Sequence, residues 1–270
     1  MISGNSSRRA FTVVELIVIV AIIALLAAIR IPVIANTKSR VQRVQCGDNL
    51  KRVGVAFRSW AENHDDRLPM QVVRANGGGA ETVGVAATAP WTNGPPPPLQ
   101  GIWGIFLVMS NELNTPKLLY CPADSAPSHN ASGAAHIQAM VFGPKTATVE
   151  GFQNDYNVSY FVGVDAYFTL PNMFLAGDHN LGTGASQTTK TGQFTSAGTN
   201  ATWLATAIGW QFNNHIQQGN VLLTDGSVQN FGISQLRLAL NRTGDRGRLA
   251  GVFSLAPSSQ GAGVNRLQFP

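Results

Sequence analysis

The stretch that decides the fold is FTVVELIVIVAIIALLAAIRIP, residues 11–32. It is almost wholly apolar, yet it carries one carboxylate, Glu15, near its start. As a helix, residues 11–29 would measure about 28 Å, which matches the hydrocarbon core of a bilayer. A carboxylate in such a segment is costly and usually marks a functional position. The stretch therefore predicts a transmembrane helix in which Glu15 has a specific role.

The residues before this stretch, MISGNSSRRA, are few, polar and basic at their end. An ordinary secretory signal places its small-residue cleavage site after the apolar run. Here the small residue that suits a cut, Ala10, comes before the run. Arg8 and Arg9 favour a cytoplasmic N-terminus, but Arg30 lies at the other end of the run, so charge alone does not fix the orientation.

The basic leader, the small residue and the apolar run together closely resemble the class III signal of type IV pilins and type II secretion pseudopilins. The resemblance implies that a prepilin peptidase cleaves between Ala10 and Phe11 and methylates the new amino group of Phe11. The usual residue before the cut is Gly, so Ala10 departs from the pattern. Glu15 becomes the fifth mature residue, and Pro32 falls where many members have a helix-loosening proline.

This resemblance implies an assembly role for Glu15. Cleavage creates a cationic amine at Phe11, and in a bundle of parallel helices Glu15 neutralises the amine of the neighbouring subunit. An unpaired charge in a low-dielectric site is heavily penalised, so the pair fixes the axial register of the subunits. The alternative is a glutamate near the membrane interface whose carboxylate reaches water.

A second apolar pattern follows Pro32. Apolar side chains recur at steps of four, three, four and three residues and form one stripe of a helix: Cys46, Leu50, Val53, Phe57 and Trp60. The helix is expected to end near ENHDDRLP, which contains Asn63, Asp65 and Pro69. In pilin-like proteins such a stripe packs on the sheet of the globular domain.

The remainder of the chain predicts a β-rich body. Residues 75–100 are rich in Gly and Pro and are expected to form a surface loop, and residues 182–201 a polar loop. GNVLLTDGSVQNF predicts a β-hairpin with Asp225-Gly226 at its turn. Five shorter stretches predict, in order, a short buried helix at 101–113, a short strand into a turn at 117–125, two β-rich stretches with turn residues at their ends at 157–166 and 172–181, and a short helix at 234–242.

The segment HIQQGNVLLTDG places His215 ten residues before Asp225, an H-x9-D-G spacing. With CGDNLKRVGVAFRSWAENHDDRLP and LLYCPAD, it resembles a large bacterial pilin-like family that carries such a region. The resemblance implies an α+β fold: a long N-terminal helix, half transmembrane and half amphipathic stem, packed on an antiparallel β-sheet. The expected parts are a leader at 1–10, the helix at 11–68, and a globular domain at 69–270 with its hairpin at 215–231.

The two cysteines, Cys46 and Cys121, are too few for a disulfide framework and have no zinc-like spacing. One bridge would tie the helix to the later domain if the body lies outside the cytoplasm. Two unpaired thiols are the alternative. Both possibilities stay open at this point.

The stem is strongly basic. Between Arg30 and Arg58 the only acidic residue is Asp48, whereas seven residues are basic: Arg30, Lys38, Arg40, Arg43, Lys51, Arg52 and Arg58. A solvated or lipid-headgroup-facing flank is the interpretation we favour over a nucleic-acid patch, because no aromatic interleaving or DNA-binding motif accompanies the charge. No nucleic-acid partner is therefore expected.

Catalytic signatures are missing from the sequence: it has no G-x-S-x-G, no H-E-x-x-H and no phosphate-binding loop. His215 and Asp225 could pair as catalytic groups or metal ligands, joined by Asp178 and His179. We favour structural roles, with His215 fixing the strand before the hairpin and Asp225-Gly226 forming the turn. No cofactor is predicted. Major pseudopilins often hold calcium, but no D-x-[DN]-x-[DN]-G loop is present here.

The sequence thus predicts a structural, non-enzymatic pilin or pseudopilin that polymerises through its N-terminal helix. Its expected partners are copies of itself, other pilins or pseudopilins, a prepilin peptidase, an inner-membrane assembly platform and the lipid bilayer. The expected location is the bacterial inner membrane, crossed once, with a periplasmic body, before assembly into a pseudopilus or pilus. The alternatives are a membrane-tethered periplasmic or surface binding module and a DNA-binding competence-type subunit.

Overall fold

The computed structural model describes residues 12–83, 100–124, 136–183, 194–198, 203–204, 208–210, 215, 217–240, 242–243 and 266–270, without the side chains of 27–38, 194–198 and 203–204. The chain divides into two compact units, Met1–Val41 and Gln42–Pro270. The expected leader, with Ala10, and the adjacent Phe11 lie outside the described residues, as does most of the predicted loop at 75–100.

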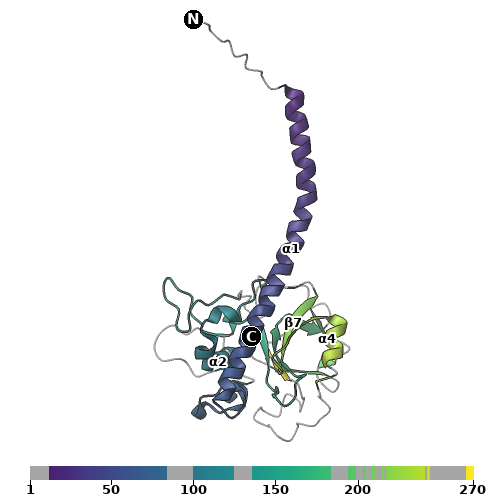
Figure 1. Cartoon of the computed structure of the whole chain (residues 1–270). Helices are drawn as coiled ribbons and strands as arrows, with labels where there is room; N and C mark the ends of the chain where they lie inside the picture. Colours follow the sequence, from purple (N-terminus) through teal and green to yellow (C-terminus); the bar gives the residue numbers. More distant parts are fainter. Residues whose placement is uncertain are drawn as a thin grey trace. The chain divides into compact units, whose positions relative to one another are not determined.

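Helix α1, Val13–Glu62, runs through the unit boundary and ends within the stretch that was expected to stop it (Figure 1). Pro32 lies inside this helix, where the resemblance places it. The remaining α-helices are short: α2 (Gly101–Val108), α3 (Ser110–Leu113) and α4 (Ile233–Leu240). Turns of 3₁₀-helix cover η1 (Pro69–Gln71), η2 (Arg74–Asn76), η3 (Ala80–Thr82), η4 (Pro116–Leu119) and η5 (Asp155–Asn157).

The transmembrane part of the predicted fold class is contradicted. Within the part of the chain that the structure describes, no helix has both the length and the apolar character needed to cross a bilayer. The apolar part of α1 with described side chains covers residues 13–26, and a spanning helix needs about 20 residues. The predicted transmembrane helix and single-pass inner-membrane location are therefore wrong on this finding, and the assignment to membrane pilins conflicts with it too.

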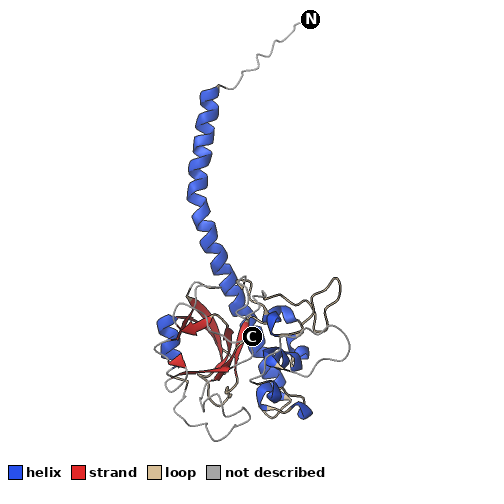
Figure 2. Cartoon of the chain, turned by 180° about the vertical axis from the view of Figure 1, so that it is seen from behind, coloured by secondary structure: helices blue, strands red, loops and turns tan. Residues whose placement is uncertain are grey.

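The body contains a mixed but mainly antiparallel sheet in the order β5-β4-β9-β1-β2-β7-β8, and a separate pair, β3-β6. Its strands are β1 (Tyr160–Gly163), β2 (Phe174–Asp178), β3 (Leu181–Thr183), β4 (Phe194–Gly198), β5 (Trp203–Leu204), β6 (Ile208–Trp210), β7 (Gln218–Leu223), β8 (Val228–Gly232) and β9 (Arg266–Gln268). The β4–β5 pair is parallel and the other strand pairs are antiparallel. In Figure 2 the strands lie to one side of the C-terminal part of α1.

The predicted stem stripe is confirmed as the core face of α1. All five of its residues are buried, and they belong to one apolar cluster with α2 and with inward side chains of the sheet such as Leu222. Gly54, also on this face, is closely approached by Leu222: a Cβ built there would lie 2.8 Å from Leu222 Cδ1. A small residue at this position therefore lets the helix backbone approach strand β7.

Local predictions differ in their outcome. The buried helix at 101–113 is confirmed as α2 and α3, and the hairpin is confirmed as β7 and β8 with Thr224–Ser227 between them. The short strand expected at the start of 117–125 is wrong, because the chain there forms the 3₁₀ turn η4, which starts at Pro116 with Thr115 as its N-cap, whereas the turn expected after it is present at residues 122–123. Part of the loop expected at 182–201 is strand β4.

Candidate functional site

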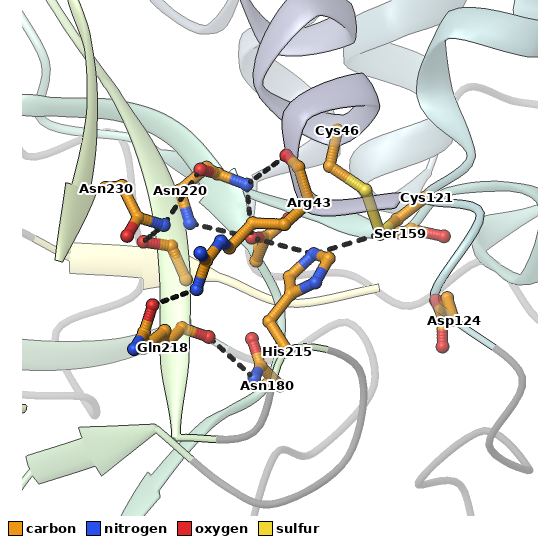
Figure 3. Close-up of polar contacts among 12 residues, drawn as sticks. Arg43, Cys46, Cys121, Asp124, Ser159, Asn180, His215, Gln218, Asn220 and Asn230 are labelled. Carbon is orange, nitrogen blue, oxygen red and sulfur yellow. Dashed lines mark hydrogen bonds and ion pairs between the residues drawn. A yellow bond between two sulfur atoms is a disulfide. The ribbon is translucent and has the colours of Figure 1, made fainter. Parts of the chain in front are cut away.

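His215, the first residue of the H-x9-D-G spacing, is buried and lies three residues before the start of β7. Its Nε2 lies 3.3 Å from Cys121 Sγ and 3.4 Å from Asp178 Oδ2. Figure 3 shows the ring of His215 between the Cys46–Cys121 bridge and the side chains of β7. His215 thus lies where α1, the chain after η4 and strand β2 meet in the body.

Cys46 and Cys121 form a disulfide across a sequence separation of 75 residues. The sequence left open a single disulfide or two unpaired thiols, and the structure contains the disulfide. It connects the stripe of α1 to the chain just after η4. Because both sulfurs are in the bridge, neither thiolate is available to a metal ion, although Cys46, Cys121, Asp178 and His215 are close enough together to suggest one.

Asp178, the last residue of β2, is fully buried. Its Oδ2 accepts hydrogen bonds from the Asn220 backbone N–H at 2.7 Å and from Asn220 Nδ2 at 3.2 Å. Burial raises the pKa of Asp178 to about 7, and the nearby Asp124 carboxylate adds to the rise, while the bonds from Asn220 oppose it. Asp178 is therefore a carboxyl group that holds a proton unusually well.

Polar side chains around Asp178 tie α1 to the hairpin. Asn220 donates through Nδ2 to the backbone carbonyl of Arg43, 3.2 Å away, and accepts from Asn230 Nδ2 at 3.1 Å. The guanidinium of Arg43 donates to the Gln218 side-chain oxygen (Figure 3). One of the basic stem residues, Arg43, is therefore engaged inside the body.

Burial, together with the positive charge of Arg43, lowers the pKa of His215 to about 4, against the opposing effect of Asp124. The folded value lies below the unfolded value near 6.5, so the unfolded chain binds the proton more readily. The stability that comes from a neutral His215 is fully present above about pH 6.5 and is lost as the pH falls through about 4. Asp178 acts in the opposite direction, because its folded pKa is raised.

Comparison of the wild-type chain with His215→Gln separates these two effects. When the pH falls from 8 to 5, the free energy of unfolding of the wild type should decrease by about 2 kcal/mol more than that of the variant. The reason is that only the wild type carries the His215 imidazole, which takes up a proton more readily in the unfolded chain. Urea denaturation at the two pH values measures the difference. Equal losses in both proteins would show that His215 does not titrate in this way.

Asp225, the other residue of the spacing, lies elsewhere. It is exposed at the turn between β7 and β8, where its Oδ1 accepts from the Ser227 backbone N–H at 2.8 Å. Gly226 follows with φ +85°, a left-handed conformation that favours glycine. The structure does not bring His215 and Asp225 together, since β7 separates them. The turn role favoured for Asp225 and Gly226 is confirmed.

A second group of buried side chains consists of Asp124, His136 and His179, of which the sequence pointed only to His179. Asp124 Oδ2 lies 3.6 Å from His136 Nδ1 and 3.5 Å from His179 Nδ1. The two rings are stacked, with centroids 4.8 Å apart and planes 7° from parallel. Asp178 and His179 were singled out as a sequential pair, but the structure divides them between the two groups. Asp124 and His136 were missed, because no spacing rule relates them to His179.

In the N-terminal unit, Thr12 and Glu15 form a capping box at the start of α1. Glu15 Oε2 accepts from the Thr12 backbone N–H at 2.9 Å and from its hydroxyl at 2.8 Å, and the Glu15 N–H donates to Thr12 Oγ1 at 3.3 Å. These bonds hold the pKa of Glu15 below its usual value. The T-x-x-E spacing is a known signature of helix starts and would have revealed this role.

The comparisons with known proteins give no family for the chain. No protein-family model matches it, and no curated protein or solved structure is significantly similar to it. The resemblance to pilins and the prediction that the chain has no cofactor, with calcium as the alternative, therefore stay predictions.

Proposed function

We propose that the chain is a structural subunit of a type IV pilus-like or type II secretion filament, and that it polymerises through its N-terminal apolar helix. The observation that carries the proposal is the exposure of this helix. Large apolar side chains of residues 13–26 are 42–73% exposed, from Ile19 at the low end to Val13 at the high end. A helix apolar all round requires cover, and contiguous exposed apolar surface marks interaction sites.

Copies of the same helix fit this surface. The body, by contrast, buries its own apolar stripe, and the exposed large apolar side chains of its described residues, such as Val44, Val55 and Leu238, are scattered rather than continuous. Packing of such segments along parallel helices would remove about 25 cal/mol of unfavourable hydration for each Å² covered. The resemblance of residues 1–32 to the prepilin signal supports the same proposal, including cleavage between Ala10 and Phe11.

Mass spectrometry of the N-terminus in the native host tests the processing step. A chain that begins at a methylated Phe11 supports the proposal. A chain that keeps Met1 and yields no filaments would contradict it and favour a separate binding module.

Glu15→Gln is expected to reduce filament yield roughly a hundredfold or more, because an unpaired buried charge costs about 3–5 kcal/mol. Glutamine still suits the capping box, so the variant removes the charge and keeps the helix start. Sedimentation of sheared filaments, followed by immunoblotting, gives the yield.

Thr12→Val is the matched control, since it removes the capping hydroxyl and leaves the Glu15 carboxylate in place. Its filament yield should stay within a few fold of wild type. If Thr12→Val abolished assembly and Glu15→Gln did not, Glu15 would act as a helix cap alone, and the charge-pairing mechanism would be wrong.

A further inference from the structure

We propose that Asp124, His136 and His179 bind a divalent transition-metal ion of the zinc type. This site lies in the body and is independent of the filament proposal. One ligand atom from each of the three residues lies within 4.8 Å of the others. All three side chains are buried, with 7% or less of their residue surface exposed.

The distances in this group are too long for hydrogen bonds but suit a shared ion. The 3.6 Å between Asp124 Oδ2 and His136 Nδ1 exceeds the usual N–H···O range. Zinc bound tetrahedrally at about 2.0–2.2 Å from nitrogen and oxygen holds neighbouring ligand atoms about 3.4 Å apart. The observed separation therefore leaves an ion the room that it needs between the two groups.

Asp124 supplies an independent reason to expect a cation. Both of its carboxylate oxygens are buried, and neither accepts a hydrogen bond from the part of the chain that the structure describes. A buried carboxylate without hydrogen bonds is costly unless a positive charge compensates it. A divalent ion at this position would do so.

The surroundings of His179 match those of a metal-bound histidine. Its Nδ1 lies 2.9 Å from the backbone carbonyl of Ser159, which accepts the proton on that nitrogen. Metal-binding imidazoles usually donate their second N–H to a carbonyl or a carboxylate, which fixes the ring and its tautomer. His179 would then offer Nε2 to the ion, while its Nδ1 remains 3.5 Å from Asp124 Oδ2.

The donor set determines the class of ion. Two imidazole nitrogens and one carboxylate oxygen suit zinc, cobalt and related ions. Calcium and magnesium prefer oxygen ligands throughout, so they should bind weakly here. A bound ion would connect Asp124 and His136, which flank the segment 125–135, to His179, which follows strand β2.

Titration of the purified, chelator-treated full-length chain tests the site. Cobalt(II) should bind with a stoichiometry of one and give the intense visible absorption of a tetrahedral site, and zinc should displace it. Asp124→Asn and His136→Gln should each weaken zinc binding by more than about 100-fold, because even the loss of an outer-shell partner costs 10–100-fold. Calcium should not compete.

His215→Gln is the matched control, since His215 belongs to the neighbouring group beside the disulfide. Zinc affinity in this variant should stay within a few fold of wild type. Circular dichroism in chelator confirms that each variant folds. If Asp124→Asn does not fold, the cobalt spectrum of the wild type still decides. A spectrum like that of hydrated cobalt, or zinc affinity that is unchanged in His136→Gln, would overturn the proposal.

Discussion

Removal of the disulfide by Cys46→Ala with Cys121→Ala is expected to lower the free energy of unfolding by about 4 kcal/mol. The bridge closes a loop with a sequence separation of 75 residues, which restricts the unfolded chain strongly. A loss of this size is a large fraction of the stability of most domains. Urea denaturation of the full-length chain, under oxidising conditions, measures it.

Reduction supplies the control for this prediction. Dithiothreitol should destabilise the wild type toward the level of the double variant and leave the variant unchanged, because only the wild type has a bond to reduce. If reductant had no effect on the wild type, the two cysteines would be free thiols in solution. That result would restore the alternative that the sequence left open.

Phe57→Ala is expected to cost about 3–5 kcal/mol, because it removes a fully buried aromatic side chain from the centre of the α1 stripe. The ring of Phe57 lies 6.0 Å from that of Phe106 in α2, so the cavity would open between two helices that hold the core together. Denaturation midpoints and slopes measured in urea give the change in unfolding free energy.

Val55→Ala on the same helix is the comparison. Val55 is 69% exposed, so its truncation should change the free energy of unfolding by less than about 0.5 kcal/mol. Equal effects at positions 55 and 57 would mean that the stripe does not face the core in solution.

Periodicity predicted the parts of the fold that depend on local sequence. The steps between Cys46 and Trp60 identified the buried face of α1, and the Asp225-Gly226 turn identified the β7–β8 hairpin. The prediction failed where prolines override apolar character, as in the 3₁₀ turn that starts at Pro116. Strand β9 pairs with β1 and β4, which are distant in sequence, and no local pattern indicates such a partner.

The candidate site was harder to predict, because its members come together only through the fold. His215 was expected to fix the strand before the hairpin, but its contacts with Cys121 and Asp178 depend on which segments lie beside β7. Asp155 is a similar case: it is buried, and its Oδ1 accepts from the Trp103 backbone N–H at the start of α2. Carboxylates with such long-range partners carry no local sequence signature.

The position of the disulfide also determines how the body would respond to tension. A pull on residues 12–41 enters the body through α1 at Gln42 and reaches Cys46 before it reaches Leu50 and the rest of the stripe. At Cys46 the disulfide transmits part of the pulling force to Cys121. The stripe therefore cannot be peeled from the sheet residue by residue from that end, and forced extension would have to shear the packed helix and sheet together.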